Sequence, residues 1–369
     1  MIKILYSCLS KSWGGMEMVT LTGVKQLMKR GIHVELLCTA ESRIHIEANN
    51  LGIIIHPVKA GGYFHPFSSL RLAFIIQKMN FDIIHTHASK DLWVIVPSLQ
   101  FLRRKIPLVL TKHIGSFIEK KDLLHRRLYR YVTKAIAISS AIKKNIIDTT
   151  PLREEQIVLI PNGVDISKFD PGVITGEKVR MEFKIGRDEL LIGMMARFSR
   201  GKGHEEFISA ASVLKKEFNN LRFIVIGEAS RGEDIYEQEI KNSAAESGLE
   251  DMIFTGYRSD IPELLAAIDI FVFPSHAEAF GIALIEAMAM QKPSVCSASE
   301  GVLDIAVDGQ TSLLFEKQNA ADLKDKIRIL INNPDKRSAF ALAARKRVLD
   351  NFNLDAVTER VCRLYNELL

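Results

Sequence analysis

The chain of 369 residues has few cysteines and little glycine or proline. Its four cysteines are scattered and form no C-x-x-C pair, which argues against zinc knuckles and a disulfide-held scaffold. With 22 glycines and 11 prolines, a fibrous or low-complexity chain is excluded as well. Because 47% of the residues are apolar, the chain can bury sizeable cores, and its length fits two globular domains.

The sequence also lacks a membrane-spanning run and a metal-binding motif. The apolar stretch at 92–102 contains Pro97 and Gln100 and falls short of the roughly 20 apolar residues that a span requires. No D-x-D motif occurs, and the H-x-H pair His85 and His87 has no acidic or cysteine companions, so we expect no metal ion and no other cofactor. Residues 1–8 read as a β-strand rather than a signal sequence, which predicts a cytoplasmic protein.

Positive charge is concentrated in the first half of the chain. Residues 1–180 hold 26 lysines and arginines against 14 acidic residues, whereas residues 181–369 hold 23 against 30. A basic half favours an anionic partner, such as a membrane surface, a polyanion or a phosphate-bearing substrate. The basic stretch at 120–134, with Arg103, Arg104 and Lys105, is either a membrane- or acceptor-facing patch or an ordinary solvated helix flank. No nucleic-acid motif accompanies the charge, so nucleic acid is not an expected partner.

Short apolar runs alternate with amphipathic segments along the chain. The expected strands lie at 2–6, 33–38, 83–85, 108–111, 135–138, 157–160, 190–196, 223–227, 252–255, 270–273, 294–296 and 312–315. Turn residues at 161–172 interrupt this alternation and mark a linker. The pattern predicts two doubly wound α/β domains, at 1–168 and 173–353. If they face each other, a deep cleft lies between the carboxyl ends of their strands.

The segment with the strongest chemical signal, residues 274–288, reads PSHAEAFGIALIEAM and follows a buried strand. Good helix formers after Gly281 predict that a helix begins there, and a helix amino terminus binds diphosphate well. Glu278 and Glu286 would flank that anion site, with the carboxylates suited to the hydroxyls of a nucleotide sugar. The alternative is that Glu278 caps the helix and Glu286 is merely solvated.

A second loop, residues 196–204, reads ARFSRGKGH and joins a strand to a helix. Arg197 and Lys202 are placed to neutralise a diphosphate, while Arg200 reads as a solvated residue. The spacing is not that of a Walker A loop, and a solvated basic turn is the alternative.

Two further segments follow strands in the first half. Gly14 and Gly15 form a glycine turn before the first helix, without the G-x-G-x-x-G pattern of dinucleotide sites. His113 lies just past a strand, where α/β sheets carry functional residues. For His85, a packed histidine bonded to backbone is the favoured interpretation.

Together these segments resemble the retaining glycosyltransferases of family 4, which have the GT-B fold of two Rossmann-like domains. The resemblance spans nearly the whole chain: the Gly-Gly turn, D-x-x-H-x-H at 82–87, T-x-H at 111–113, P-N-G-V-D at 161–165, R-x4-K-G at 197–203, and the E-x7-E motif formed by Glu278 and Glu286. It implies an acceptor-binding first domain, onto which a final helix at 354–369 packs back, and a donor-binding second domain.

The resemblance also implies a role for each site residue. Arg197 and Lys202 would stabilise the diphosphate leaving group, and His113 and Glu278 would contact the donor sugar. The donor-binding residues would be Glu286 at the ribose, Phe280, Gly281 and Ile282 at the diphosphate, Tyr257 and Arg258 near the base, and Gly14 and Gly15 over the donor phosphates or the acceptor. The family's G-G-x-P-E segment is altered, because residues 300–304 read EGVLD.

The expected function is transfer of a sugar from a nucleotide diphosphate sugar to an acceptor hydroxyl, with retention of configuration and without a metal. The acceptor would be a glycan or a lipid-linked intermediate of cell-envelope polysaccharide or lipopolysaccharide synthesis, reached at the inner face of the membrane. Two alternatives remain: a GT-B-fold nucleotide-sugar epimerase, which needs no acceptor, and a non-catalytic sugar-binding protein.

Overall fold

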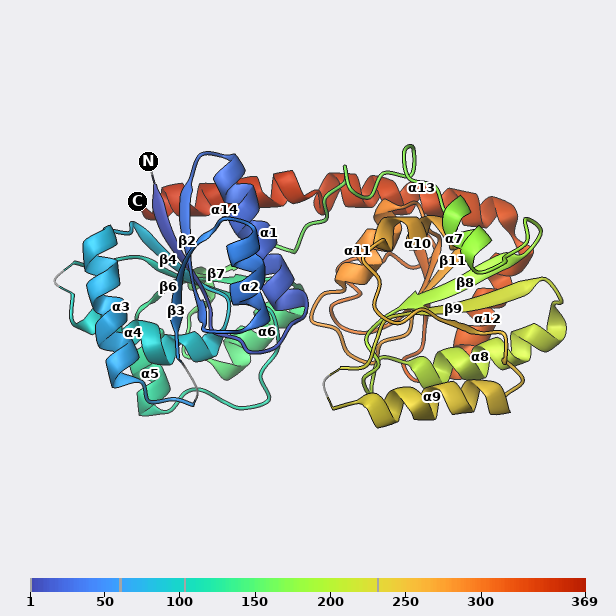
Figure 1. Ribbon diagram of the computed structural model, residues 1–369, viewed down its shortest axis with the longest axis horizontal. Helices are drawn as coiled ribbons and strands as arrows, with labels where there is room; N and C mark the ends of the chain where they lie inside the picture. The colour runs from blue at the N-terminus through green and yellow to red at the C-terminus, as the bar shows by residue number, and fades with distance from the viewer. Residues whose placement is uncertain (1, 60–61, 103, 231) are drawn as a thin grey trace. The chain divides into compact units, whose positions relative to one another are not determined.

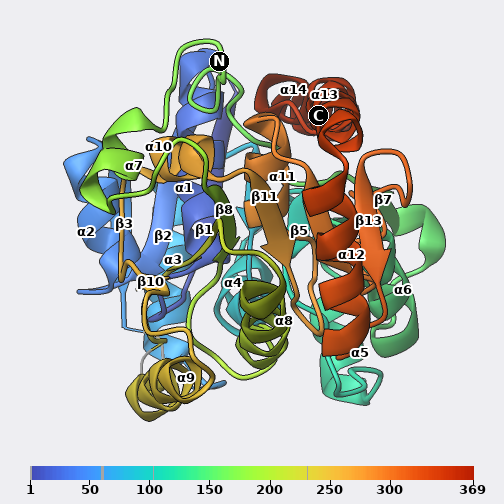
Figure 2. The same ribbon diagram turned by 90° about the vertical axis from the view of Figure 1, so that its right-hand side faces the viewer.

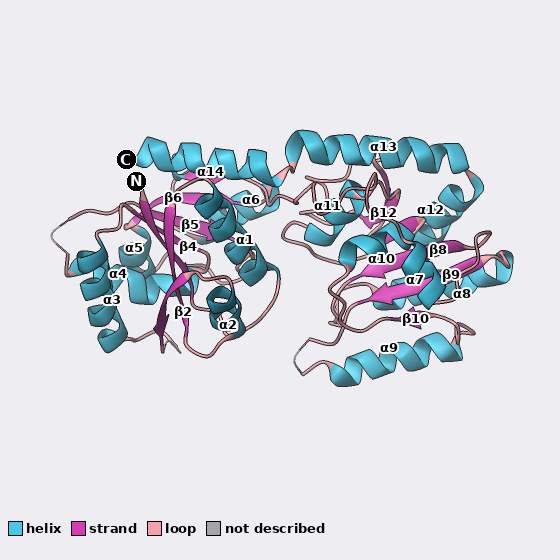
Figure 3. Cartoon of the chain, turned by 45° about the horizontal axis from the view of Figure 1, so that its top comes forward, coloured by secondary structure: helices cyan, strands magenta, loops and turns pink. Residues whose placement is uncertain are grey.

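The computed structural model describes residues 2–59, 62–102, 104–230 and 232–369, so Arg103 of the basic stretch lies outside the described residues. The chain folds into two compact units (Figure 1). The first combines residues 1–162 with residues 355–369, and the second comprises residues 163–354. Each unit is a parallel sheet between helices (Figure 3).

A seven-stranded sheet with the order β3-β2-β1-β4-β5-β6-β7 forms the centre of the first unit. Its strands are β1 (Lys3–Cys8), β2 (His33–Thr39), β3 (Ile54–Val58), β4 (Ile83–Thr86), β5 (Leu108–Lys112), β6 (Val132–Ala137) and β7 (Ile157–Leu159). β1 and β4 pair directly, with Ile4 beside Ile83, although the chain visits β2 and β3 between them. Such a point of reversal is where α/β sheets bind ligands, outside the carboxyl ends of the strands.

Helices cover both faces of this sheet. α1 (Gly15–Lys29), α2 (Arg43–Asn50) and α14 (Leu354–Leu368) share one apolar core with alternate strand residues such as Ile4 and Tyr6. The hydroxyl of Tyr365 in α14 lies 3.0 Å from that of Tyr6, which ties the end of the chain into this core. α3 (Pro66–Met79), α4 (Leu92–Gln100) and α5 (Leu123–Tyr129) lie on the opposite face, with the short η1 (Ser89–Asp91) before α4 (Figure 1). η2 (Glu154–Gln156) precedes β7, and α6 (Ser140–Thr149) joins β6 to β7.

The second unit repeats the plan with six parallel strands in the order β10-β9-β8-β11-β12-β13. They are β8 (Leu190–Met195), β9 (Leu221–Ile226), β10 (Ile253–Phe254), β11 (Ile270–Phe273), β12 (Ser294–Ser297) and β13 (Ser312–Phe315). Its helices are α7 (Glu177–Glu182), α8 (His204–Glu217), α9 (Asp234–Glu246), α10 (Ile261–Ala267), α11 (Ile282–Ala289), α12 (Ala320–Asn332) and α13 (Pro334–Asn351). α8 and α12 pack side by side (Figure 2). The reversal point of this sheet lies between β8 and β11.

The chain enters and leaves the second unit through two adjacent segments. The backbone N–H of Val164 donates to the carbonyl of Phe352 at 2.8 Å, and that of Leu354 donates to Val164 at 3.0 Å. A Cβ atom on Gly163 would lie 2.7 Å from the Cα atom of Leu354, so only glycine allows this approach. The turn residues of the predicted linker therefore serve a close crossing of two segments.

The expected fold class, two Rossmann-like parallel α/β units, is confirmed. One strand was missed: β3, at the edge of the first sheet, contains His56 and Pro57 and is only partly buried. Proline lacks an amide donor and tends to occur on edge strands, so an edge position tolerates a segment whose sequence is a poor strand signal. No helix in the described part of the chain combines the length and the apolarity that crossing a membrane needs.

Candidate functional site

Two loops meet at the reversal point of the second sheet. The 196–203 loop follows β8 and the 274–281 loop follows β11, and these strands are parallel neighbours. The backbone N–H of His276 donates to the carbonyl of Gly201 at 2.9 Å. Gly203 has φ +81°, and a Cβ atom there would lie 2.4 Å from the carbonyl oxygen of Pro274. The two strongest sequence motifs therefore form one backbone-linked surface.

The helix predicted to begin after Gly281 is α11, and Gly281 is its N-cap. Gly281 has φ +122° and provides no side-chain cap, so the first amide groups of α11 are directed at the loop surface. Phe280 is buried and its ring lies 5.7 Å from that of Phe352, which anchors the loop from below. This helix end can bind an anion through backbone amides and the helix dipole.

Lys202 and Glu278 lie together on this surface. The Nζ atom of Lys202 is 2.6 Å from Oε1 of Glu278, and the two side chains are 26% and 17% exposed. The alternative in which Glu278 caps α11 is wrong, because its carboxylate accepts from Lys202 and α11 has no side-chain cap. An ammonium group and a carboxylate are thus side by side in a partly desolvated position.

Glu286 lies on α11, at a position that is partly buried. Burial raises the pKa of its carboxyl group to about 7, against a smaller lowering effect of Lys168. The solvated alternative for Glu286 does not hold, because its side chain is partly buried in the structure. A carboxyl group held here, without full hydration, is available to a ligand hydroxyl.

The remaining predicted residues of the second unit differ in how they are held. Arg197 is exposed, and Tyr257 is 58% exposed. Arg200 pairs with Glu239 at 2.8 Å on the surface, in agreement with a role outside the site.

Arg258 is engaged twice. Its guanidinium donates to both carboxylate oxygens of Glu182, at 2.6 and 2.9 Å, and to both of Asp260. These two carboxylates raise the pKa of Arg258 above its usual value. The contacts make Arg258 a clamp between α7 and the 255–260 loop, and its assignment to the nucleobase stays a prediction.

Gly301 is a site residue that the sequence analysis did not assign. Its backbone N–H donates to the carbonyl of Glu278 at 3.0 Å, and a Cβ atom there would lie 2.4 Å from that same oxygen. Gly301 therefore supports the peptide that carries Glu278. A second missed contact joins His276 to Glu206 of α8, with Nε2 2.8 Å from Oε1. The available signal for Gly301 was a glycine shortly after a buried strand. The contact between His276 and Glu206 has no signal in the sequence.

In the first unit, Gly14 is the N-cap of α1 and Gly15 is its first residue, so both lie just beyond β1 at the reversal point. Asp91, which the sequence analysis did not assign, joins this turn to the segment after β4. Its Oδ2 atom accepts from the Ser7 hydroxyl at 2.7 Å, the Leu9 amide at 3.2 Å and the Thr86 hydroxyl at 3.1 Å. Its Oδ1 atom is buried and has no partner among the described residues. Burial raises the pKa of Asp91 to about 6.

His113 lies in a stack of three buried histidines. Its Nε2 atom is 3.0 Å from Nδ1 of His87, and the ring of His85 stacks on His87 with centroids 4.5 Å apart. Burial lowers the pKa of His85 to about 3 and that of His113 to about 4, and lowers the pKa of His87 well below its usual value. All three imidazoles are therefore neutral near pH 7.

His85 is a packed histidine, but it bonds to side chains rather than to backbone. Its Nε2 atom lies 2.7 Å from the Thr111 hydroxyl, and its Nδ1 atom lies 2.5 Å from the Tyr365 hydroxyl. This position of His85 ties β4 to β5 and α14.

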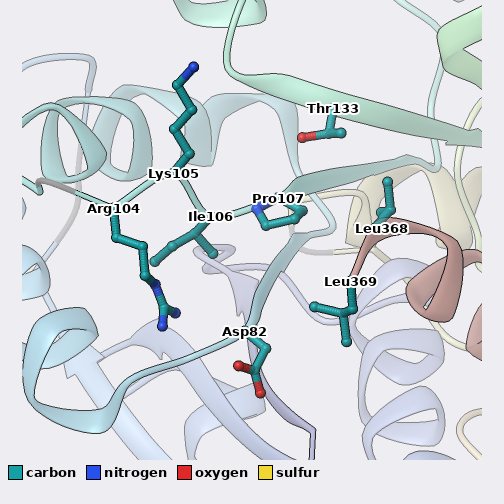
Figure 4. Close-up of a pocket in the computed structure, with 8 residues that line it drawn as sticks. All are labelled: Asp82, Arg104, Lys105, Ile106, Pro107, Thr133, Leu368 and Leu369. Atoms are coloured by element: carbon teal, nitrogen blue, oxygen red, sulfur yellow. The ribbon is translucent and has the colours of Figure 1, made fainter.

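An open pocket of about 410 Å³ lies at the opposite end of the strands of the first sheet, near the amino ends of β4, β5 and β6 (Figure 4). Its lining residues are Asp82, Arg104, Lys105, Ile106, Pro107, Thr133, Leu368 and Leu369. The pocket is thus separate from the histidines and Asp91. In the ranges that the structure describes, no three His, Cys, Asp or Glu side chains are grouped so as to hold a metal ion.

Known protein families match both halves of the chain. Residues 177–347 match the model of "Glycosyl transferases group 1", and residues 13–168 match that of "Glycosyltransferase Family 4".

The individual relatives have modest sequence identity to this chain. The capsular polysaccharide biosynthesis glycosyltransferase CapM of Staphylococcus aureus is 28% identical over 64% of this chain and 62% of its own length, so this match spans less than two thirds of CapM. The N,N'-diacetylbacillosaminyl-diphospho-undecaprenol alpha-1,3-N-acetylgalactosaminyltransferase of Campylobacter jejuni is 26% identical over 83% of both chains. The structure of HepE from Anabaena, in complex with UDP and glucose, superposes with a TM-score of 0.85 at 24% identity, over 99% of this chain and 100% of HepE. That last likeness shows the fold.

Proposed function

We propose a specific reaction for this chain, which belongs to glycosyltransferase family 4. In this reaction a sugar passes from a nucleotide diphosphate sugar to a hydroxyl of a lipid-linked or polysaccharide acceptor, with retention of configuration. The observation that carries the proposal is the Lys202–Glu278 pair beside the amino end of α11, at the reversal point of the second sheet.

On donor binding, the diphosphate would replace Glu278 as the partner of Lys202. In the free protein this ammonium group is bound by Glu278. A diphosphate carries more negative charge than one carboxylate, and the amides of α11 and the exposed Arg197 would help to attract it. Glu278, released from Lys202, would then accept hydrogen bonds from sugar hydroxyls, and Glu286 from the ribose. UDP is the first nucleotide to test, because HepE, which shares this fold, was crystallised with UDP and glucose.

The chemical step needs stabilisation of the departing nucleotide. The bond between the anomeric carbon and the diphosphate oxygen breaks, a bond from the acceptor oxygen to that carbon forms, and the acceptor proton passes to the leaving phosphate. Lys202 and the helix amides, together with the exposed Arg197, would provide positive charge where the negative charge grows, which is electrostatic catalysis. We propose that they suffice without a metal. In the first unit, the family resemblance gives neutral His113 a hydrogen bond to the donor sugar.

The acceptor is proposed to be held at a membrane surface. The enzyme of Campylobacter jejuni is named for a diphospho-undecaprenol acceptor and CapM for capsular polysaccharide synthesis. The excess of basic residues in the first half of this chain would suit an anionic membrane, and a peripheral position on its inner face follows from the proposal.

A transfer assay tests this reaction against the two alternatives. Purified protein is incubated with UDP-sugars, with and without undecaprenyl-diphosphate-linked sugars, and both the released UDP and the lipid product are measured. A transferase releases UDP in proportion to glycosylated lipid. An epimerase would convert the sugar without any acceptor, and a sugar-binding protein would consume no donor, so either result contradicts the proposal. Arg200→Ala is the matched control for Lys202→Ala, since Arg200 pairs with Glu239 outside the site.

A further inference from the structure

Large apolar side chains are exposed along one edge of the first unit. They lie at residues 62–67, which follow β3, and at residues 114–124, which follow β5. A third segment, residues 88–93, follows β4 and carries Lys90 and Trp93. Phe64 and Phe67 are each 86% exposed, and Phe117 and Leu123 are also almost fully exposed. Monomeric proteins rarely leave such residues clustered on their surface without an interaction that uses them.

Ring contacts show that the three segments are adjacent. The ring of Tyr63 lies 5.4 Å from that of Trp93, and the ring of Trp93 lies 5.7 Å from that of His125 at the start of α5. The ammonium group of Lys90 lies 5.3 Å from the centre of the Tyr63 ring. Because α4 packs against both α3 and α5, the residues around these rings lie side by side. We call this group the basic aromatic surface and define it by Phe64, Phe67, Lys90, Leu123 and Arg126.

The charge of these segments is positive. Residues 62–67, 88–93 and 114–130 contain six lysines and arginines and three acidic residues, Asp91, Glu119 and Asp122. Each of these acids already has a contact. Asp91 is buried and accepts from the hydroxyl of Ser7. Glu119 lies 3.6 Å from Lys121, and Asp122 caps α5 by accepting from the amides of Leu124 and His125. Arg126, Arg127 and Arg130 are exposed on α5.

We propose that the basic aromatic surface docks the first unit onto an anionic lipid bilayer. Aromatic residues belong at the membrane interface, where their rings sit at headgroup level, and basic residues are attracted to anionic headgroups. The docking surface follows the same strand ends that carry His113 and Asp91, so a lipid-linked acceptor could present its sugar there while its lipid remains in the bilayer. The inference deepens the proposed function and rests on it for the nature of the acceptor.

Vesicle flotation at low and high salt tests the docking directly. The full chain is mixed with phosphatidylcholine vesicles, with or without phosphatidylglycerol. We expect binding only to the anionic vesicles and release at high salt. The triple variant Arg126→Gln, Arg127→Gln, Arg130→Gln should bind on the order of 100-fold more weakly, from about five-fold per charge. The variant Phe64→Ser, Phe67→Ser should lose at least about ten-fold.

The matched control replaces two exposed apolar residues of the second unit, Val173→Ser and Ile235→Ser, and should bind like the wild type. Failure of the wild type to bind anionic vesicles at low salt would overturn the proposal, as would equal loss in the control and in the phenylalanine variant. A dimer in light scattering that the phenylalanine variant abolishes, without vesicle binding, would instead make the surface an interface between copies and would also overturn it. Binding of UDP is measured in parallel on every variant. Its absence in a wild type that binds vesicles would count against the proposed function alone.

Discussion

Replacement of Glu278 by glutamine should tighten the binding of UDP while it slows transfer. Lys202 is held by Glu278 at 2.6 Å in the free protein, so a diphosphate must displace a carboxylate to reach the ammonium group. Glutamine keeps the shape of the side chain but removes its charge. The two side chains are 26% and 17% exposed, and ion pairs of this partly solvated kind contribute up to about 1 kcal/mol. Affinity for UDP should therefore rise up to about five-fold.

Isothermal titration with UDP measures this effect, and Glu239→Gln is its control. Glu239 forms an ion pair of similar length with Arg200, but on the exposed surface, so its removal should leave UDP affinity unchanged. Turnover of Glu278→Gln should fall on the order of 10²-fold, because a hydrogen-bonding partner of the sugar is lost. Unchanged or weaker UDP binding by Glu278→Gln would refute the exchange of partners at Lys202.

Three further predictions concern individual residues. Gly301→Ala should displace the Glu278 peptide, since its Cβ atom would lie 2.4 Å from the Glu278 carbonyl oxygen, and turnover should fall about ten-fold or more. The control is Gly309→Ala, which has no atom within 4 Å of the new Cβ atom and a positive φ, so that only stability should change. Equal turnover of both variants would contradict this role of Gly301. Glu286→Gln should stabilise the protein at pH 8 but not at pH 4. Burial raises the pKa of Glu286 to about 7 in the folded chain, so its contribution to stability is present below its ordinary pKa and is lost as the pH rises through 7. In urea unfolding, the effect of the substitution on the unfolding free energy should differ between the two pH values by an amount on the order of 2 kcal/mol. An effect that does not depend on pH would contradict the raised pKa. The NMR signals of His85, His87 and His113 should keep the positions of neutral imidazole from pH 8 down to about pH 5. Burial lowers the pKa of His85 to about 3 and that of His113 to about 4, and it holds the pKa of His87 well below its usual value. Titration of any of the three near pH 6.5 would contradict their burial.

The parts of the fold that the sequence predicts are those with local signals. Strands buried on both faces, such as β8 and β11, read as continuous apolar runs, and Gly281 marks the start of α11. β3 has no such signal, because its place at the sheet edge tolerates His56 and Pro57. The same reasoning placed Lys202 and Glu278 in two strand–helix loops but did not foresee that they pair.

Contacts between residues far apart in the sequence were beyond prediction. Arg258 is bound by Glu182, and Asp91 by Ser7, and neither pairing leaves a mark in local sequence. The histidine stack likewise depends on the register of β4 and β5, which brings His87 and His113 side by side just beyond the carboxyl ends of these strands. Such contacts follow from the sheet order, which the alternation of strands and helices leaves open.

The most direct test of the central claim is titration of nucleoside diphosphates into the wild type, Lys202→Ala and Arg200→Ala. If the loops after β8 and β11 form the donor site, one diphosphate should raise the melting temperature of the wild type, corresponding to about 2.7 kcal/mol at a hundred times its dissociation constant. The shift should persist in Arg200→Ala and disappear in Lys202→Ala. A shift of equal size in all three proteins, or no shift with any nucleotide, would contradict the assignment of this site to a nucleotide sugar.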